Sequence, residues 1–179
     1  MWMTDRKRTS ASFFSRNRHI SFFVGQVGMA SQTIAPDEVL RKYHVIAVVG
    51  ASKNPEKDAN TVPAFMKEKG YTIIPVNPTA DQILGEKAFP TLLDLPADVA
   101  NRIEVVDVFR PSEELPEVAR QMIELKKRYG RPFVFWAQLG LENDEAKKAL
   151  SDAGIPYVMN ACMRVVFNLK LQSSNKYRS

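Results

Sequence analysis

The sequence has few of the residues that hold disulfides and metal ions. Its one cysteine, Cys162, excludes an internal disulfide framework and a zinc site built from several cysteines. Two histidines, His19 and His44, leave little for metal sites of another kind, so no bound metal is expected. The chain also lacks an apolar run near the roughly 18 residues that a membrane span requires. Its 179 residues, 45% hydrophobic and 25% charged, are typical of one soluble globular domain.

Positive charge is concentrated at the start of the chain. Residues 1–28 hold five basic residues and one acidic residue, a net charge of +4, so the rest of the chain carries only +1 of the total of +5. A nearly neutral folded part does not favour nucleic acid as a partner. Residues 1–34 are interpreted as a basic leader, with three alternatives: a mitochondrial transit peptide, translation from upstream of a physiological start at Met29, or a disordered arm. The cytoplasm is the expected location, with the mitochondrion as the alternative.

Short apolar runs alternate with helical patterns from about Ala35 onward. The runs predict strands over 44–49, 71–76, 103–109, 132–138 and 156–159. Helices are expected from Pro36, over 61–69, from Ser112 as a capping residue, from Asn143, and over 162–171, with a helical turn at 81–84 and a brief edge strand at 87–89. This alternation predicts a doubly wound α/β domain over 35–171, with a mainly parallel sheet of about five strands and helices on both faces. A polar tail over 172–179 follows.

In such a sheet the ligand binds at the carboxyl ends of the strands, where the strand order reverses. The candidate segments are those that directly follow the predicted strands: 50–57, 77–78, 109–110 and 138–140. A nicotinamide-binding turn normally has the pattern G-x-G-x-x-G, with an acidic residue ending the second strand. Here only Gly50 is present, because Ser52 and Pro55 occupy the next two glycine positions and Asn77 replaces the acid. These departures argue against ordinary NAD binding.

The same turn is compatible with another phosphorylated ligand. Ser52 and backbone N–H groups can bind phosphate oxygens at the start of a helix, and Lys53 and Lys57 add two positive charges. A charge-assisted hydrogen bond contributes about 1.5–3 kcal/mol, so two or three of them hold a polyphosphate. The segment is interpreted as a phosphate-binding turn, with a plain turn and solvated lysines as the alternative.

Six short segments of the chain form a recognisable set. They are VVGASKNP at 48–55, GYTIIPVNP at 70–78, ILGEK at 83–87, VVDVFR at 105–110, WAQLG at 136–140 and VMNAC at 158–162. In their order and spacing across roughly 36–171 they resemble the small stand-alone CoA-binding proteins. That family consists of single Rossmann-like domains similar to the CoA-binding domain of the succinyl-CoA synthetase α subunit. The resemblance implies a Rossmann-like fold and coenzyme A as the cofactor.

The resemblance also implies which residues contact coenzyme A. They are Gly50, Ala51, Ser52 and Lys53 in the phosphate turn, Lys57 and Asn60 reaching the phosphates from the next helix, Asn77 and Pro78 at the adenosine, Phe109 and Arg110 in the cleft, and Gln138, Leu139 and Gly140 along the pantetheine. The sequence departs from the family pattern at two places. Pro111 replaces a second basic residue, and Asn160-Ala161 replaces an Asp-Arg pair before the cysteine.

The sequence shows no evident catalytic residue. The synthetase relatives use a phosphorylated histidine, but His19 lies in the leader and His44 opens the first strand at the amino end of the sheet. Asp107 and Glu104 have no evident acid or base partner. The leading interpretation is therefore a non-catalytic module that binds CoA or an acyl-CoA, with neither nucleic acid nor membrane as a partner. The alternative is a small NAD(P)-binding or acyl-CoA-using enzyme in which Cys162, following the last strand, is a reactive thiol.

Overall fold

Five parallel strands form the central sheet of the protein, in the order β2-β1-β5-β6-β7. The computed structural model describes residues 33–172, so the predictions on the basic leader before Thr33 and on the tail after Gln172 lie outside the described residues. The strands are β1 (Val45–Val49), β2 (Thr72–Val76), β5 (Val105–Val108), β6 (Val134–Ala137) and β7 (Tyr157–Val158). The doubly wound parallel sheet predicted from the sequence is confirmed.

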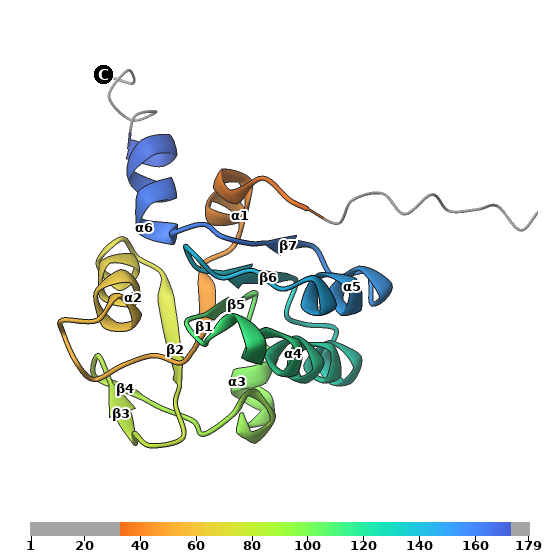
Figure 1. The fold of residues 1–179 in the computed structure, drawn as a ribbon. Helices are drawn as coiled ribbons and strands as arrows, with labels where there is room; N and C mark the ends of the chain where they lie inside the picture. Colours follow the sequence, from red (N-terminus) through yellow and green to blue (C-terminus); the bar gives the residue numbers. More distant parts are fainter. Residues whose placement is uncertain (1–32, 173–179) are drawn as a thin grey trace, which may run out of the picture.

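Helices cover both faces of the sheet (Figure 1), which explains why β5 and β6 are buried along their whole length. One face carries α1 (Pro36–Lys42), α2 (Asp58–Glu68), α6 (Met163–Val166) and the π-helical turn η3 (Phe167–Gln172). The other carries α3 (Ala97–Ala100), α4 (Leu115–Tyr129) and α5 (Asp144–Asp152), with the 3-10 turns η1 (Leu92–Asp94) and η2 (Ser112–Glu114). Trp136 packs toward the first face and Phe135 toward the second, both fully buried. Within residues 33–172, none of these helices combines the length and apolarity that a bilayer span demands.

The chain between β2 and β5 differs from the sequence prediction. The helical turn expected at 81–84 is wrong, because β3 (Gln82–Ile83) pairs antiparallel with β4 (Glu86–Lys87). Leu84 and Gly85 join these strands with φ angles of 54° and 78°. Two consecutive residues with positive φ are the geometry of a tight hairpin turn, which a helix cannot accommodate. The predicted edge strand is reduced to β4 and one parallel bridge between Phe89 and Val76.

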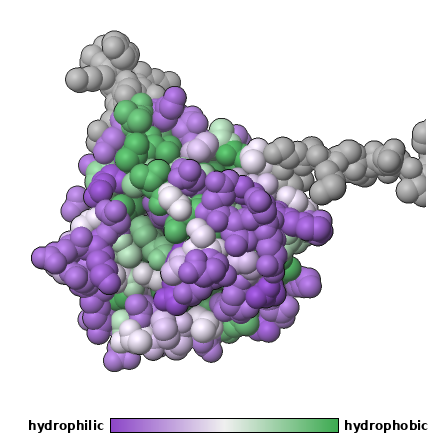
Figure 2. Space-filling model, viewed as in Figure 1, coloured by the Kyte–Doolittle hydropathy of each residue, from purple (hydrophilic) through white to green (hydrophobic). Residues whose placement is uncertain are grey.

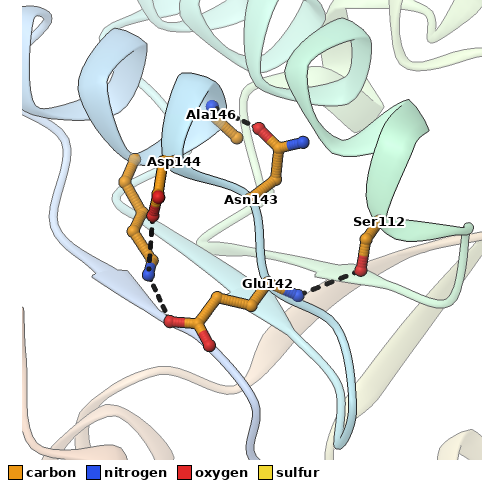
Figure 3. A network of polar contacts seen from close by, with 6 residues as sticks. Ser112, Glu142, Asn143, Asp144 and Ala146 are labelled. Atoms are coloured by element: carbon orange, nitrogen blue, oxygen red, sulfur yellow. Dashed lines mark hydrogen bonds and ion pairs between the residues drawn. The ribbon is translucent and has the colours of Figure 1, made fainter.

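Of the two polar residues predicted to cap helices, Asn143 caps α5 but Ser112 does not cap α4 (Figure 3). Asn143 caps α5 as expected, since its side-chain oxygen accepts a hydrogen bond from the Ala146 N–H at 3.0 Å. Ser112 makes no capping bond to its own helix. Its Oγ instead accepts from the Glu142 N–H at 3.1 Å, which ties the segment after β5 to the loop after β6. The predicted capping role of Ser112 is therefore wrong.

Candidate functional site

The order of the strands creates a switch point between β1 and β5. From β1 the chain moves outward to β2 and later returns to form β5 on the other side of β1. The segment after β1 leads to α2 on one face, whereas the segment after β5 leads to α4 on the opposite face. The two segments therefore diverge at the carboxyl edge of the sheet, where doubly wound proteins bind ligands.

Gly50 sets how closely the two segments approach each other. Its φ of +85° is a conformation that only glycine adopts readily, and its N–H donates to the Val76 carbonyl at 2.9 Å. A Cβ atom at this position would lie 2.9 Å from the Arg110 Cδ and 3.2 Å from the Phe109 carbonyl group. The turn after β1 thus packs directly on the end of β5, with no room for a side chain.

Two asparagine side chains fix the shape of the turn. Asn60 Nδ2 donates to the Ser52 carbonyl at 2.6 Å, and Asn77 Nδ2 donates to the Ala51 carbonyl at 2.7 Å. The Ser52 N–H donates to the Ala59 carbonyl at 3.0 Å, and the Ser52 Oγ accepts from the backbone at position 54. Both amides hold backbone carbonyls and so support the turn itself, and the contact of Asn60 and Asn77 with a ligand stays a prediction.

The segment after β1 carries two exposed lysines beside two exposed acidic residues, Glu56 and Asp58. Lys53 and Lys57 are exposed, and neither forms an ion pair within residues 33–172. Lys57 is also the N-cap of α2, and no side chain caps this helix. The N-terminus of a helix carries partial positive charge from its unpaired N–H groups. Two lysines without an ion partner among the described residues and a helix N-terminus therefore belong to the same short segment.

One pocket of about 340 Å³ lies on the α4 side of the switch point and is called the α4-side pocket. It is lined by Val49, Gly50, Val76, Pro78, Pro90, Thr91, Arg110, Glu113, Glu114, Glu117, Val118 and Gln121. The apolar side chains form its walls, and three glutamates supply negative charge. Arg110 is engaged by one of them, with its Nη2 at 2.6 Å from the Glu114 Oε2. This pocket suits a neutral ring with polar edges better than a phosphate group.

A second pocket of about 310 Å³ lies on the opposite face and is called the α6-side pocket. Its lining residues are Asp58, Val62, Phe109, Gln138, Leu139, Leu141, Cys162, Arg164 and Val165. Leu139 and Val165 are exposed, at 69% and 47% of their surface. Apolar surface also gathers over α6 and η3 in the space-filling view (Figure 2). The pocket is therefore apolar at its mouth, with a half-buried thiol from Cys162 in its lining.

The family model of the CoA binding domain matches residues 44–168 of this chain. The chain belongs to the CoA-binding domain family. A Bacillus subtilis relative, the uncharacterized protein YneT, is 41% identical over 128 residues, which are 72% of this chain and 88% of YneT. The acetate–CoA ligase (ADP-forming) II of Archaeoglobus fulgidus is 39% identical over 75 residues, but these are only 10% of the ligase.

Solved structures share the fold of this CoA-binding domain. A hypothetical protein from Pyrococcus horikoshii OT3 superposes with a TM-score of 0.69 at 36% identity, over 78% of this chain and 94% of that one. The structure of ID.343 from Thermus thermophilus gives a TM-score of 0.66 at 34% identity, over 75% and 98%. The Rossmann-like fold implied by the sequence is confirmed.

The CoA-binding domain brings most of the predicted site residues to the two pockets and the turn between them. Gly50, Pro78 and Arg110 line the α4-side pocket, and Phe109, Gln138 and Leu139 line the α6-side pocket. Of the others, Ala51, Ser52, Lys53, Lys57, Asn60 and Asn77 form or support the turn, and Gly140 lies just beyond the α6-side pocket.

Several residues of the site were not predicted from the sequence. Glu113 of η2 and Glu117 and Gln121 of α4 line the α4-side pocket because one side of this continuous helical segment turns toward it. Only the spacing of four positions within a helix hinted that they share a face. Asn160, noted as a departure from the family pattern, has a φ of +55°, and its Oδ1 accepts from the Gly140 N–H at 2.7 Å. Because Asn160 stands where the family pattern has an aspartate, its side-chain oxygen makes this bond without the negative charge of a carboxylate.

Asp107 and Gln138 form a buried polar pair beside the α6-side pocket. Their exposed fractions are 1% and 4%, and Gln138 Nε2 donates to the Asp107 Oδ1 at 2.8 Å. Burial raises the pKa of Asp107 to about 7, although hydrogen bonds from Gln138 and the Val108 backbone oppose the shift.

Glu104 lies away from both pockets, at the amino end of the sheet, where its side chain accepts hydrogen bonds from the N–H groups of His44 and Val45. Within residues 33–172, no group of three acidic, histidine or cysteine side chains could hold a metal ion.

We expect Gly50→Ala to destabilise the domain more than Gly130→Ala. Both glycines have positive φ, but a Cβ at Gly130 meets nothing within 4 Å. The control should lose about 1–2 kcal/mol of unfolding free energy from backbone strain alone. Gly50→Ala should lose a further ~1–3 kcal/mol from overpacking against Phe109 and Arg110. Urea unfolding of both variants measures this difference, and equal losses would refute the close packing.

Asp107 should make stability depend on pH. Its pKa of about 7 in the folded protein lies above the ordinary value of 3.8, so the folded state keeps a proton that the unfolded chain releases between these values. The unfolding free energy should therefore fall as the pH rises from 4 to 7, by up to about 1.4 kcal/mol per pH unit. Asp107→Asn should remove this fall, whereas Asp152→Asn, at an exposed position, should retain it. Urea unfolding at four pH values tests the prediction, and an unchanged slope in Asp107→Asn would contradict it.

Proposed function

We propose that this domain binds coenzyme A, or an acyl-CoA, across the switch point of its sheet. The adenine enters the α4-side pocket, the phosphates cross the turn that follows β1, and the pantetheine passes over Phe109 into the α6-side pocket. The observation that carries the proposal is the arrangement of two pockets on opposite faces, joined at the contact between Gly50 and Phe109. A long ligand with two different ends fits this arrangement, and the family supplies its class.

The charges of the site support this orientation. Coenzyme A carries a diphosphate and a 3′-phosphate, which suit the exposed Lys53 and Lys57 and the uncapped start of α2. The three glutamates of the α4-side pocket repel phosphate, so that pocket suits the neutral adenine base, with the 3′-phosphorylated ribose outside it. Asn77 directly follows β2 and engages Ala51, so the position that holds the ribose-binding acid of NAD proteins carries no negative charge here.

A binding module without chemistry of its own agrees best with the described residues. Neither pocket is lined by a histidine. His44 lies before β1, at the opposite end of the sheet, with its ring stacked on Tyr71 at 5.1 Å between centroids. One observation favours the alternative of an acyl-CoA-using enzyme: Cys162 lines the pocket that we assign to the thiol end of the ligand. Acyl transfer from acetyl-CoA to Cys162, detected as a gain in protein mass, would support that alternative.

Isothermal titration with CoA, acetyl-CoA, NAD and NADP tests the proposal. We expect CoA or acetyl-CoA to bind and the nicotinamide nucleotides to bind far more weakly. Lys53→Ala with Lys57→Ala should weaken CoA binding by about 10-fold or more, as expected for lost charge-assisted hydrogen bonds, and should reduce its salt dependence. Lys127→Ala, an exposed change in the last turn of α4, is the matched control. Tight NADP binding without CoA binding would refute the proposal, and unchanged affinity in the double variant would refute the phosphate assignment.

A further inference from the structure

The side chains of Asp107 and Gln138 both face the α6 side of the sheet. Asp107 pairs in register with Val48 and Trp136, which belong to the core under α2 and α6. Successive residues of a strand point to opposite faces. Gln138 therefore shares the face of Trp136, two residues earlier, and it lines the α6-side pocket. The pair is polar, almost fully buried and placed beside the pocket that we assign to the pantetheine.

The orientation of the Gln138 amide follows from its partner. An ionised carboxylate can only accept hydrogen bonds, so Asp107 holds the Nε2 end of the amide. The other end, Oε1, receives no hydrogen bond from residues 33–172. No buried side-chain nitrogen or oxygen in this part of the chain lacks a partner, so Oε1 keeps accessible surface. Gln138 is 4% exposed, and the opening that it lines is the α6-side pocket.

We propose that Asp107 is a positioning residue that keeps the carbonyl oxygen of Gln138 directed into the α6-side pocket, so that the pocket selects a ligand arm bearing amide N–H donors. The inference rests on the proposed function, because the pantetheine arm of coenzyme A carries two secondary amides. A hydrogen-bond acceptor that is already fixed in place costs the complex little ordering entropy. A site built to accept an N–H also rejects an arm that leaves the acceptor unpaired.

Protonation of Asp107 would reverse this arrangement. A neutral carboxyl can donate its O–H to Oε1, and the flipped amide would then present N–H groups to the pocket in place of an acceptor. Burial places the pKa of Asp107 near neutrality, so both forms are accessible around pH 7. The other groups that line the pocket are Asp58 of α2, Cys162 and Arg164, with Arg164 Nη2 at 3.5 Å from the Asp58 Oδ1. The register partners of Asp107 on the neighbouring strands β1 and β6 are Val48 and Trp136, and neither side chain is charged.

Titration of the full chain with two ligands tests the inference. One is CoA and the other is adenosine 3′-phosphate 5′-diphosphate, which lacks the pantetheine arm. Gln138→Met should weaken CoA binding at pH 8 by roughly 3- to 10-fold, the effect of one hydrogen bond, and should leave the shorter ligand unaffected. Unchanged CoA affinity, or equal losses for both ligands, would overturn the inference. Wild type that binds neither ligand would overturn the proposed function as well.

Asp107→Asn provides a second readout that a purely structural role would not change. Asparagine keeps the shape of aspartate but does not titrate, so the variant remains informative even if Gln138→Met fails to fold. Between pH 8 and pH 6, wild type should lose CoA affinity relative to Asp107→Asn by roughly 3- to 10-fold. Because both proteins meet the same ligand at each pH, titration of the ligand phosphates cancels. Parallel pH profiles for the two proteins would contradict the positioning role.

Discussion

The turn after β1 packs against the end of β5 so closely that a Cβ atom at Gly50 would lie 2.9 Å from Arg110. This contact depends on a backbone conformation with positive φ and on the two amides that hold the carbonyls of Ala51 and Ser52. It brings the two diverging segments together at one edge of the sheet. The α4-side pocket and the α6-side pocket lie on either side of it, so the path from one to the other crosses this turn.

The distribution of charge along this path distinguishes its two ends. Glutamates line the α4-side pocket, and the turn carries Lys53, Lys57 and the start of α2. The α6-side pocket is mainly apolar apart from Gln138 and the Asp58–Arg164 ion pair. A molecule with a nucleoside, a set of phosphates and a long neutral arm matches this sequence of environments. The Asp107–Gln138 pair adds a polar feature with a defined orientation at the apolar end. Burying a carboxyl there costs stability at neutral pH, which is typical of a group kept for binding rather than for folding.

The parallel sheet and the segments at its carboxyl edge could be predicted, because the apolar runs, the helix signals and their alternation along the chain are local features of the sequence. The roles of Asn60 and Asn77 could not, since their partners are backbone carbonyls fixed only in the folded turn. The pocket residues of α4 depend on how that helix is rotated on the sheet. The hairpin of β3 and β4 depends on a left-handed Leu84, a conformation that its residue type does not suggest. Ser112 bonds to Glu142 across the fold, a pairing that no sequence signal encodes.

A crystal structure of the complex with coenzyme A would test most directly whether two pockets on opposite faces hold the two ends of one ligand. We predict the adenine in the α4-side pocket, the diphosphate beside Lys53 at the turn after Gly50, and the thiol end in the α6-side pocket near Cys162. A coenzyme A molecule with both ends on one face of the sheet, or with its diphosphate against the glutamates of the α4-side pocket, would contradict this arrangement.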